Sequence, residues 1–344
     1  MHRPVPTPPL PADRWLGALL AHALGDAVGA GVEGAPRAEA ERYAAALRAS
    51  GADALRPHHG RPAGHVSDDT QCTRLLLESL AAEGQVVPAR VASGLATLVA
   101  CGAYVGGGEG TLGVARRLAQ GVPWTDAAAP PGYEANGAAM RAAPIGLWLA
   151  GDERALLAAA DAQAAITHRS PVARGGAQVV ALAVARAAAT CGRPWTDAPG
   201  FVHALADGVA EAAPPWAAWL TRLAEAAAQG DACAAIAPCA PAGDGSSRRH
   251  GVSGHAVPSV IAALAVAITH MDDPWEAILA AIALGGDTDS VAAMAGAVTG
   301  ARAASAAPLP GSLLSRLHEH GAWDQVDGYA ATIRRAAERV GAGA

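Results

Sequence analysis

The chain has 344 residues, of which 51% are apolar and only 4% aromatic, and its formal net charge is −6 with an isoelectric point near 6.0. The scarcity of aromatic residues predicts a core built mainly from Ala, Val and Leu on closely packed helices. The acidic balance leaves no basic surface for a phosphate backbone, so we expect no stable binding to DNA or RNA.

The cysteines and the N-terminal segment bear on the compartment. Five cysteines without a Cys-x-x-Cys pair indicate free thiols in a reducing compartment, and we expect a cytoplasmic protein. Residues 1–12 are Pro-rich, lack the apolar stretch of a signal peptide and are expected to be flexible. The apolar run from Trp15 is interrupted by His22 and Asp26, so we predict no membrane-spanning segment. No linker divides residues 13–340, which we interpret as a single domain and expect to be monomeric.

Helical periodicity dominates the chain. It predicts helices, in chain order, over 14–24, 37–49, 70–82, 89–103, 136–149, 153–166, 173–190, 215–228, 256–269, 275–284, 290–303 and 324–340. Alternating runs typical of β-strands are almost absent, which predicts an all-α fold, a single compact multi-helix domain.

Segments rich in Gly, Pro or Ser separate the helices, and we expect functional loops among them. They cover 51–67, 106–110, 127–134 and 238–253. For 238–253, which contains Arg248, Arg249 and His250, two interpretations stay open: a mobile flap over a pocket or a solvated insertion. His58, His59, His250 and His255 lack partners at zinc-ligand spacing, and we interpret them as loop or solvated histidines.

Two carboxylate pairs stand at predicted helix starts far apart in the sequence. Asp68 and Asp69 precede the helix 70–82, and Asp287 and Asp289 precede the helix 290–303. Adjacent buried carboxylates repel each other, and a helix dipole of roughly half a unit charge cannot neutralise two of them. Ordinary N-capping explains only one Asp in each pair. Because neither run offers Cys or His, the pairs predict one site for a hard divalent cation, Mg²⁺ or Mn²⁺.

Five segments together resemble the ADP-ribosylglycohydrolases in residues, order and spacing. They are Gly-Asp-Ala-Val-Gly at 25–29 followed by Glu33, Ser-Asp-Asp-Thr at 67–70, Asn-Gly-Ala-Ala-Met-Arg-Ala-Ala-Pro at 136–144, Thr-His at 167–168, and Gly-Gly-Asp-Thr-Asp-Ser at 285–290. The resemblance runs from about Trp15 to Pro310, and the run at 285–289 is its most specific part. It implies an all-α domain with a central binuclear metal site.

The resemblance also implies which residues hold the two Mg²⁺ or Mn²⁺ ions. The implied ligands are Ser67, Asp68, Asp69, Asp287, Asp289 and Ser290. Ser67 and Ser290 stand where the family usually has Thr, but a serine hydroxyl offers the same ligand oxygen and lacks only the methyl group that stiffens χ1. We therefore expect ligation at both positions.

Further site residues follow from the same resemblance. Glu33 matches a carboxylate that reaches the metals and the scissile bond, and with Asp68 and Asp69 it makes up the expected catalytic set. The implied substrate-binding residues are Gly106, Gly107, Gly108, Asn136 and His168, with the glycine run placed where the family wraps the diphosphate of ADP-ribose. Taken alone, these residues also fit a surface glutamate, an ordinary turn and a satisfied core histidine.

Three other residues are assigned structural roles. Asp26 is expected to accept hydrogen bonds from loop backbone rather than to take part in chemistry. Met140 is expected to pack in the interior, and Arg141 to form a buried ion pair.

The implied activity is hydrolysis of an N- or O-glycosidic bond at the anomeric carbon of an ADP-ribosylated protein or small molecule, releasing ADP-ribose. The metals are expected to bind the ribose diol, nearby carboxylates to stabilise oxocarbenium-like charge, and Asp69 or Glu33 to orient or deprotonate the water. Two alternatives stay open: a magnesium-dependent phosphohydrolase and a non-catalytic ADP-ribose-binding protein, like the crystallins among the family's relatives.

The motifs do not specify the acceptor group from which ADP-ribose is released. An enzyme that recognises the guanidinium of ADP-ribosyl-arginine should have a carboxylate beside the glycine run at 106–108. Only Glu109 stands nearby. Arginine, serine, a nucleobase and a free metabolite all stay open.

Overall fold

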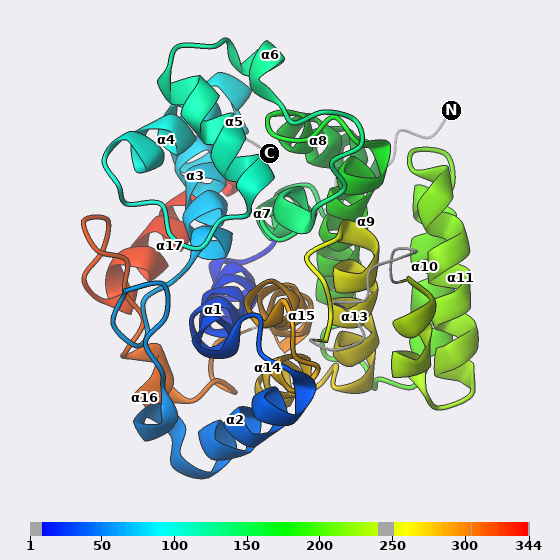
Figure 1. The fold of residues 1–344 in the computed structure, drawn as a ribbon. Coiled ribbons are helices and arrows are strands. Elements are labelled where there is room, and N and C mark those ends of the chain that lie inside the picture. Colours follow the sequence, from blue (N-terminus) through cyan, green and yellow to red (C-terminus); the bar gives the residue numbers. More distant parts are fainter. Residues whose placement is uncertain (1–8, 240–250, 304, 343–344) are drawn as a thin grey trace.

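Helices joined by loops make up the described part of the chain, as the sequence predicts. The computed structural model describes residues 9–239, 251–303 and 305–342. Within these ranges there are isolated β-bridges but no β-strand. The all-α prediction is therefore confirmed, and the helices pack together as one compact domain (Figure 1).

The helices follow one another closely along the chain. The first half contains α1 (Ala12–Gly29), α2 (Arg37–Ser50), α3 (Asp68–Glu83), α4 (Pro88–Ala100), α5 (Glu109–Ala119), α6 (Trp124–Ala127), α7 (Ala143–Trp148) and α8 (Glu153–Ala165). The second half contains α9 (Pro171–Ala189), α10 (Ala198–Val209), α11 (Pro214–Ala228), α13 (Ala256–Thr269), α14 (Pro274–Ala283), α15 (Thr288–Ala303), α16 (Gly311–Leu314) and α17 (Val326–Ala342). Short 3₁₀ helices between them are η1 (Ala30–Val32), η2 (Gly51–Ala54), η3 (Asn136–Ala138), η4 (Ala232–Ala235) and η5 (Ala237–Cys239).

Two central helices, α1 and α15, run antiparallel in close contact (Figure 1). A β-carbon at Gly17 would lie 2.6 Å from the carbonyl oxygen of Gly300, and one at Gly29 would lie 2.7 Å from the α-carbon of Asp289. A side chain at either glycine would push the helices apart, because packed interiors hold no spare space. The contact brings the C-terminal end of α1 against the N-terminal end of α15, where the acidic residues stand.

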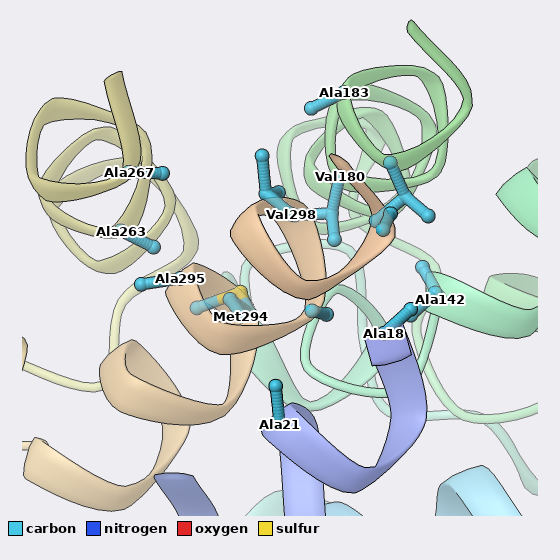
Figure 2. Close-up of a cluster of buried hydrophobic side chains, with 14 of the residues drawn as sticks. Ala18, Ala21, Ala142, Val180, Ala183, Ala263, Ala267, Met294, Ala295 and Val298 are labelled. Carbon is cyan, nitrogen blue, oxygen red and sulfur yellow. The ribbon is translucent and has the colours of Figure 1, made fainter. Parts of the chain in front are cut away.

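The core around this pair consists largely of small apolar side chains from the surrounding helices (Figure 2). Those labelled include Ala18 and Ala21 of α1, Val180 and Ala183 of α9, Ala263 and Ala267 of α13, and Met294, Ala295 and Val298 of α15, all buried. Each alanine buries little apolar area, so the helices gain cohesion by lying close together along their length. The predicted core of Ala, Val and Leu is confirmed.

Helix α10 lies beside α11 at the edge of the domain, in a segment where the sequence predicts no helix (Figure 1). Pro199, Gly200 and Gly208 interrupt the apolar pattern of this segment. However, Pro199 lies in the first turn, where a missing N–H costs nothing, and the Asp197 carboxylate caps the helix by accepting from the Gly200 N–H at 2.7 Å. The N-terminal cap and the favourable position of the proline therefore allow a helix to form despite the two glycines.

The prediction of one continuous helix over 136–149 is wrong, because the segment forms η3 and then α7. Pro144 lacks the N–H that a continuous helix would donate to the Met140 carbonyl. The buried imidazole of His22 replaces it, with Nε2 lying 2.8 Å from the Met140 oxygen. A carbonyl only accepts, so Nε2 carries the hydrogen. Burial lowers the pKa of His22, which keeps the ring neutral.

Two segments are long and apolar enough to cross a membrane, Ala12–Val32 and Pro171–Ala189. Their apolar windows are 94% and 78% buried inside the fold, and core helices of this kind pass the same test of length and composition. The two segments contain the central helices α1 and α9, so their apolar character is explained by the core.

Two of the sequence-based expectations fall outside the described residues. Of the segment 238–253, residues 240–250 lie outside them, and these include Arg248, Arg249 and His250. Residues 1–8 of the N-terminus expected to be flexible also lie outside them.

Candidate functional site

Acidic side chains at four helix ends converge in one place. They are Asp26 near the end of α1, Glu33 just after η1, Asp68 and Asp69 at the start of α3, and Asp287 and Asp289 at the start of α15. Carboxylate oxygens of Asp26, Asp69 and Asp289 lie within 4.8 Å of one another. Oxygens of Glu33, Asp287 and Asp289 lie equally close. The two pairs that are distant in sequence therefore form one cluster.

Asp26 fixes the start of α3 within this cluster. Its carboxylate accepts hydrogen bonds from the Ser67 N–H at 3.0 and 3.1 Å and from the Thr70 N–H at 3.0 Å, in a fully buried position. These N–H groups belong to the first turn of the helix, where no intrahelical acceptor exists. The predicted role of Asp26 in supporting backbone is confirmed, and the structure additionally places it within reach of the other carboxylates.

The run Gly285–Gly286 positions Asp287. Both glycines have left-handed φ angles, +72° and +81°, which residues with a β-carbon rarely adopt. The Gly286 carbonyl accepts from the Gly34 N–H at 2.7 Å, and the Asp287 N–H donates to the Val252 carbonyl at 2.8 Å. The backbone before α15 is thus held between two loops, which explains why the motif needs two glycines before its first carboxylate.

Three of the carboxylates receive hydrogen bonds from uncharged side chains. Tyr104 Oη donates to Asp68 Oδ2 at 2.8 Å, Asn136 Nδ2 to Asp287 Oδ2 at 2.6 Å, and Ser290 Oγ to Asp69 Oδ2 at 3.2 Å. Asn136, predicted to bind substrate, therefore contacts an acidic residue of the cluster. Tyr104 is absent from the sequence prediction, because nothing in the local sequence links it to Asp68.

The cluster is electrostatically unfavourable without a cation. Burial raises the pKa of Asp68 to about 7 and that of Asp287 to about 6, and neighbouring carboxylates contribute to both shifts. Burial and then neighbouring acidic charges raise the pKa of Asp69 and Asp289 well above the usual range. Asp69 Oδ1 is buried and accepts no hydrogen bond from the described residues. Oxygen donors with excess negative charge and an open acceptor fit a hard divalent cation.

A cavity of about 580 Å³ opens beside the cluster. Among the predicted site residues, those lining it are Glu33, Asp68, Asp69, Gly106, Gly108, Asn136, Asp287, Asp289 and Ser290. Further walls come from residues outside the predicted site set, chiefly Thr111, Tyr133, Glu134 and the loop 252–255. Of these, 133–134 and 252–253 fall in segments where functional loops are expected. No Lys or Arg of the described chain lines it. Any phosphate in the cavity would therefore be held by backbone N–H groups rather than by cationic side chains.

Three predicted site residues are not among those that line the cavity. Ser67 is fully buried and caps α3, its Oγ accepting from the Asp69 N–H at 3.3 Å. Gly107 leaves room for the ring of Tyr104, which a β-carbon would overlap. His168 is fully buried and stacks on Tyr133, with ring centroids 5.6 Å apart. Burial, and then the charge of Arg141, lowers the pKa of His168 to about 3.

Glu33 has a partner that the sequence prediction missed. His59 Nε2 lies 2.5 Å from Glu33 Oε2 across the edge of the site, and Glu33 raises the pKa of His59. His59 adopts a φ of +46°, unusual for a residue with a β-carbon, in a tight turn closed by reciprocal backbone hydrogen bonds between His58 and Arg61. The dipeptide His59-Gly60 is a weak sequence signal for such a turn. His58 lies in a loop, as expected, and is buried there.

The predicted ion pair of Arg141 is wrong. This buried guanidinium donates from Nε to Gln163 Oε1 at 2.8 Å and from Nη2 to Thr167 Oγ1 at 2.7 Å and the Gln163 carbonyl at 3.1 Å. Neutral oxygens thus satisfy its donors, and no acidic side chain of the described residues pairs with it. Met140 packs in the interior, as predicted.

Comparisons with known proteins agree with the geometry. The family described as ADP-ribosylglycohydrolase matches residues 7–343. ADP-ribosyl-[dinitrogen reductase] glycohydrolase of Rhodospirillum rubrum is 35% identical over 167 residues, which are 48% of this chain and 55% of that protein. The chain thus aligns with about half the length of that relative. A solved structure titled "ADP-ribosylglycohydrolase-related protein complex" superposes with a TM-score of 0.68 at 25% identity, covering 96% of this chain and 98% of the other.

Proposed function

Because the chain belongs to the ADP-ribosylglycohydrolase family, we propose that it hydrolyses the glycosidic bond between ADP-ribose and an acceptor group and releases ADP-ribose. The observation that carries the proposal is the convergence of Glu33 and two Asp pairs, three of whose four members are buried, on one cavity. The name of the Rhodospirillum rubrum relative specifies an ADP-ribosylated protein. That name supports an ADP-ribosylated protein, or a small molecule carrying the same group, as the substrate here.

We propose that the cluster holds two divalent cations, Mg²⁺ or Mn²⁺. The proposed ligands are Ser67, Asp68, Asp69, Asp287, Asp289 and Ser290. The raised pKa values and the open acceptor on Asp69 support a cation, and the absence of Cys and His from the cluster favours a hard one. When bound, such cations neutralise the acidic charge and coordinate hydroxyl oxygens of the ribose.

Glu33 is the better candidate for the group that orients the attacking water. Its side chain is 30% exposed at the edge of the site, so it meets incoming water, and His59 holds one of its oxygens. Asp69 is almost fully buried, and one of its oxygens lies within hydrogen-bonding reach of the hydroxyls of Ser67 and Ser290. The remaining carboxylates provide the negative environment that stabilises an oxocarbenium-like sugar.

Backbone groups are the proposed contacts of the diphosphate. Gly106 and Gly108 line the cavity, and Gly108 is the N-cap of α5, whose first N–H groups have no intrahelical acceptor. A helix N-terminus binds anions through these N–H groups and the helix dipole. This arrangement supplies phosphate binding without the cationic side chains that the cavity lacks.

A product assay tests the proposed function. The enzyme with Mn²⁺ is incubated with ADP-ribosylated arginine, ADP-ribosylated serine, an ADP-ribosylated nucleobase and a phosphate monoester, and both ADP-ribose and inorganic phosphate are quantified. We expect ADP-ribose from at least one glycoside and no phosphate. Phosphate as the product would favour the phosphohydrolase, and ADP-ribose binding without any product would favour a non-catalytic binding protein.

We further propose a cytoplasmic location. All five cysteines are free in the structure, which suits a reducing compartment.

A further inference from the structure

The two carboxylate oxygens of Asp68 have different surroundings. Oδ2 accepts the hydrogen bond from Tyr104 at 2.8 Å. Oδ1 lies beside Gly106, where a β-carbon would come within 3.4 Å of it, and receives no hydrogen bond from the described residues. The tyrosine hydroxyl therefore occupies one oxygen and leaves the other beside the glycine run that lines the cavity.

The hydroxyl of Tyr104 acts as the donor in its hydrogen bond with Asp68. The side chain is half-buried, and the pKa of a tyrosine hydroxyl is about 10. The phenol therefore keeps its hydrogen at neutral pH. A carboxylate can only accept, so the direction of this hydrogen bond is fixed.

A clamp holds Tyr104 against the first turn of α3. Gln71 is fully buried, and its side chain donates to the Ala103 carbonyl at 2.8 Å while accepting from the Val105 N–H at 3.1 Å. The Asp68 N–H donates to the Val105 carbonyl at 2.8 Å. Three hydrogen bonds thus fix the backbone on either side of Tyr104 to the helix that carries Asp68. They hold the tyrosine close to the Asp68 carboxylate.

Gly107 also contributes to the position of Tyr104. A β-carbon there would overlap the ring and hydroxyl of Tyr104. The φ of Gly107 is not in the left-handed region, so backbone freedom does not require a glycine at this position. The space it leaves is filled by the tyrosine that contacts Asp68.

We infer that Tyr104 is a positioning residue for a divalent cation: it fixes Asp68 through Oδ2 so that Oδ1 is presented to the ion. This inference rests on the proposed function, because it presumes that the acidic cluster binds a cation. Removal of a side chain that hydrogen-bonds to a metal ligand typically weakens metal binding by about 10- to 100-fold. Tyr104→Phe removes only the hydroxyl and should weaken binding by about that factor.

The experiment is calorimetric titration of the purified chain with Mn²⁺ alone, comparing wild type with Tyr104→Phe. Tyr329→Phe is the control, because it makes the same chemical change at a buried tyrosine whose hydroxyl has no partner among the described residues. We expect about 10- to 100-fold weaker binding for Tyr104→Phe, about wild-type affinity for the control, and similar thermal unfolding midpoints for both variants without metal.

A second variant keeps the test independent of the hydroxyl itself. Gly107→Ala displaces the Tyr104 ring without removing any polar group, and should also weaken Mn²⁺ binding. Affinities within about twofold of wild type in both variants would overturn the inference while leaving the proposed metal centre intact. Absence of Mn²⁺ binding by the wild-type chain would instead overturn the metal centre of the proposed function, and the inference with it.

Discussion

The two sides of the cavity are built by different means. On the acidic side, Asp68, Asp69 and Asp289 stand in the first turns of α3 and α15 and are almost fully buried. The rest of the lining comes largely from loops, which supply Tyr133, Glu134 and the segment 252–255. Helix starts fixed by a packed core hold charge in a defined place, whereas loops adapt to the shape of a ligand. The comparison suggests that the acidic side carries the chemistry and the loop side the choice of substrate.

Chelation should have the largest effect, because it removes the charge that the acidic side is built to hold. With EDTA, we expect release of ADP-ribose to stop and to return with Mg²⁺ or Mn²⁺ in preference to Zn²⁺. Bound cation at 100 times its Kd also stabilises the fold by about 2.7 kcal/mol, so the unfolding midpoint should fall on chelation. Full activity in chelator would show that the acidic side works without metal.

Asp287→Asn should come next. The change removes a ligand charge from the cluster, so we expect more than about 100-fold weaker Mn²⁺ binding by calorimetry, beyond the loss typical of a supporting group. Asp287 has a raised pKa, so its ionised form is destabilised by burial, and the metal-free variant should unfold at a higher temperature than wild type. Asp26→Asn should instead lower the unfolding midpoint, because Asp26 supports the backbone of α3. Unchanged Mn²⁺ affinity in Asp287→Asn would mean that the site is elsewhere.

Glu33→Gln should separate chemistry from binding at the edge between the two sides. Loss of acid–base assistance typically costs 10²- to 10⁴-fold in rate, and we expect turnover to fall by about that factor. ADP-ribose affinity should stay within about tenfold, roughly 1.4 kcal/mol. Glu41→Gln, on the exposed face of α2 where Glu41 pairs with Arg37, serves as the control. Turnover near that of wild type would make Glu33 an ordinary surface glutamate and leave Asp69 as the candidate.

His168 gives the smallest effect and tests the loop side. Its pKa is about 3 in the fold, below the value of 6.5 for an unperturbed histidine, so the unfolded chain binds the extra proton. Stability contributed by the neutral ring is therefore present above pH 6.5 and lost as the pH falls. Between pH 7.5 and 5.5 the wild type should lose about 1.4 kcal/mol more than His168→Gln, measured by urea unfolding. Equal losses in the two proteins would show that the ring is accessible to protons.

The same division explains what the sequence could predict. Asp68, Asp69, Asp287 and Asp289 are recognisable because charge at the start of an apolar helix is a local pattern. Tyr104 and His59 lie in loops and contact acidic residues 36 and 26 positions away, with helices between them. Their contacts depend on turns that no periodicity encodes. Only the folded chain brings such pairs together.

The errors of prediction have equally local causes. The sequence predicts a carboxylate partner for Arg141, but amide, hydroxyl and carbonyl oxygens satisfy its buried guanidinium instead. The segment 136–149 has helical periodicity throughout, but the periodicity does not register the donor that Pro144 lacks. In both cases the prediction fails because the sequence pattern does not identify the hydrogen-bonding partner.

The antiparallel contact of α1 with α15 has a consequence for how the protein is made. Gly17 is synthesised 283 residues before its partner Gly300, and Gly29 is synthesised 260 residues before its partner Asp289. At translation rates of about 5–20 residues per second, the first helix waits roughly 10 to 60 seconds for the second. During that interval an apolar helix is without its partner, and the acidic cluster is incomplete. A nascent chain stalled before residue 287 should therefore bind no metal and should depend on chaperones to stay soluble.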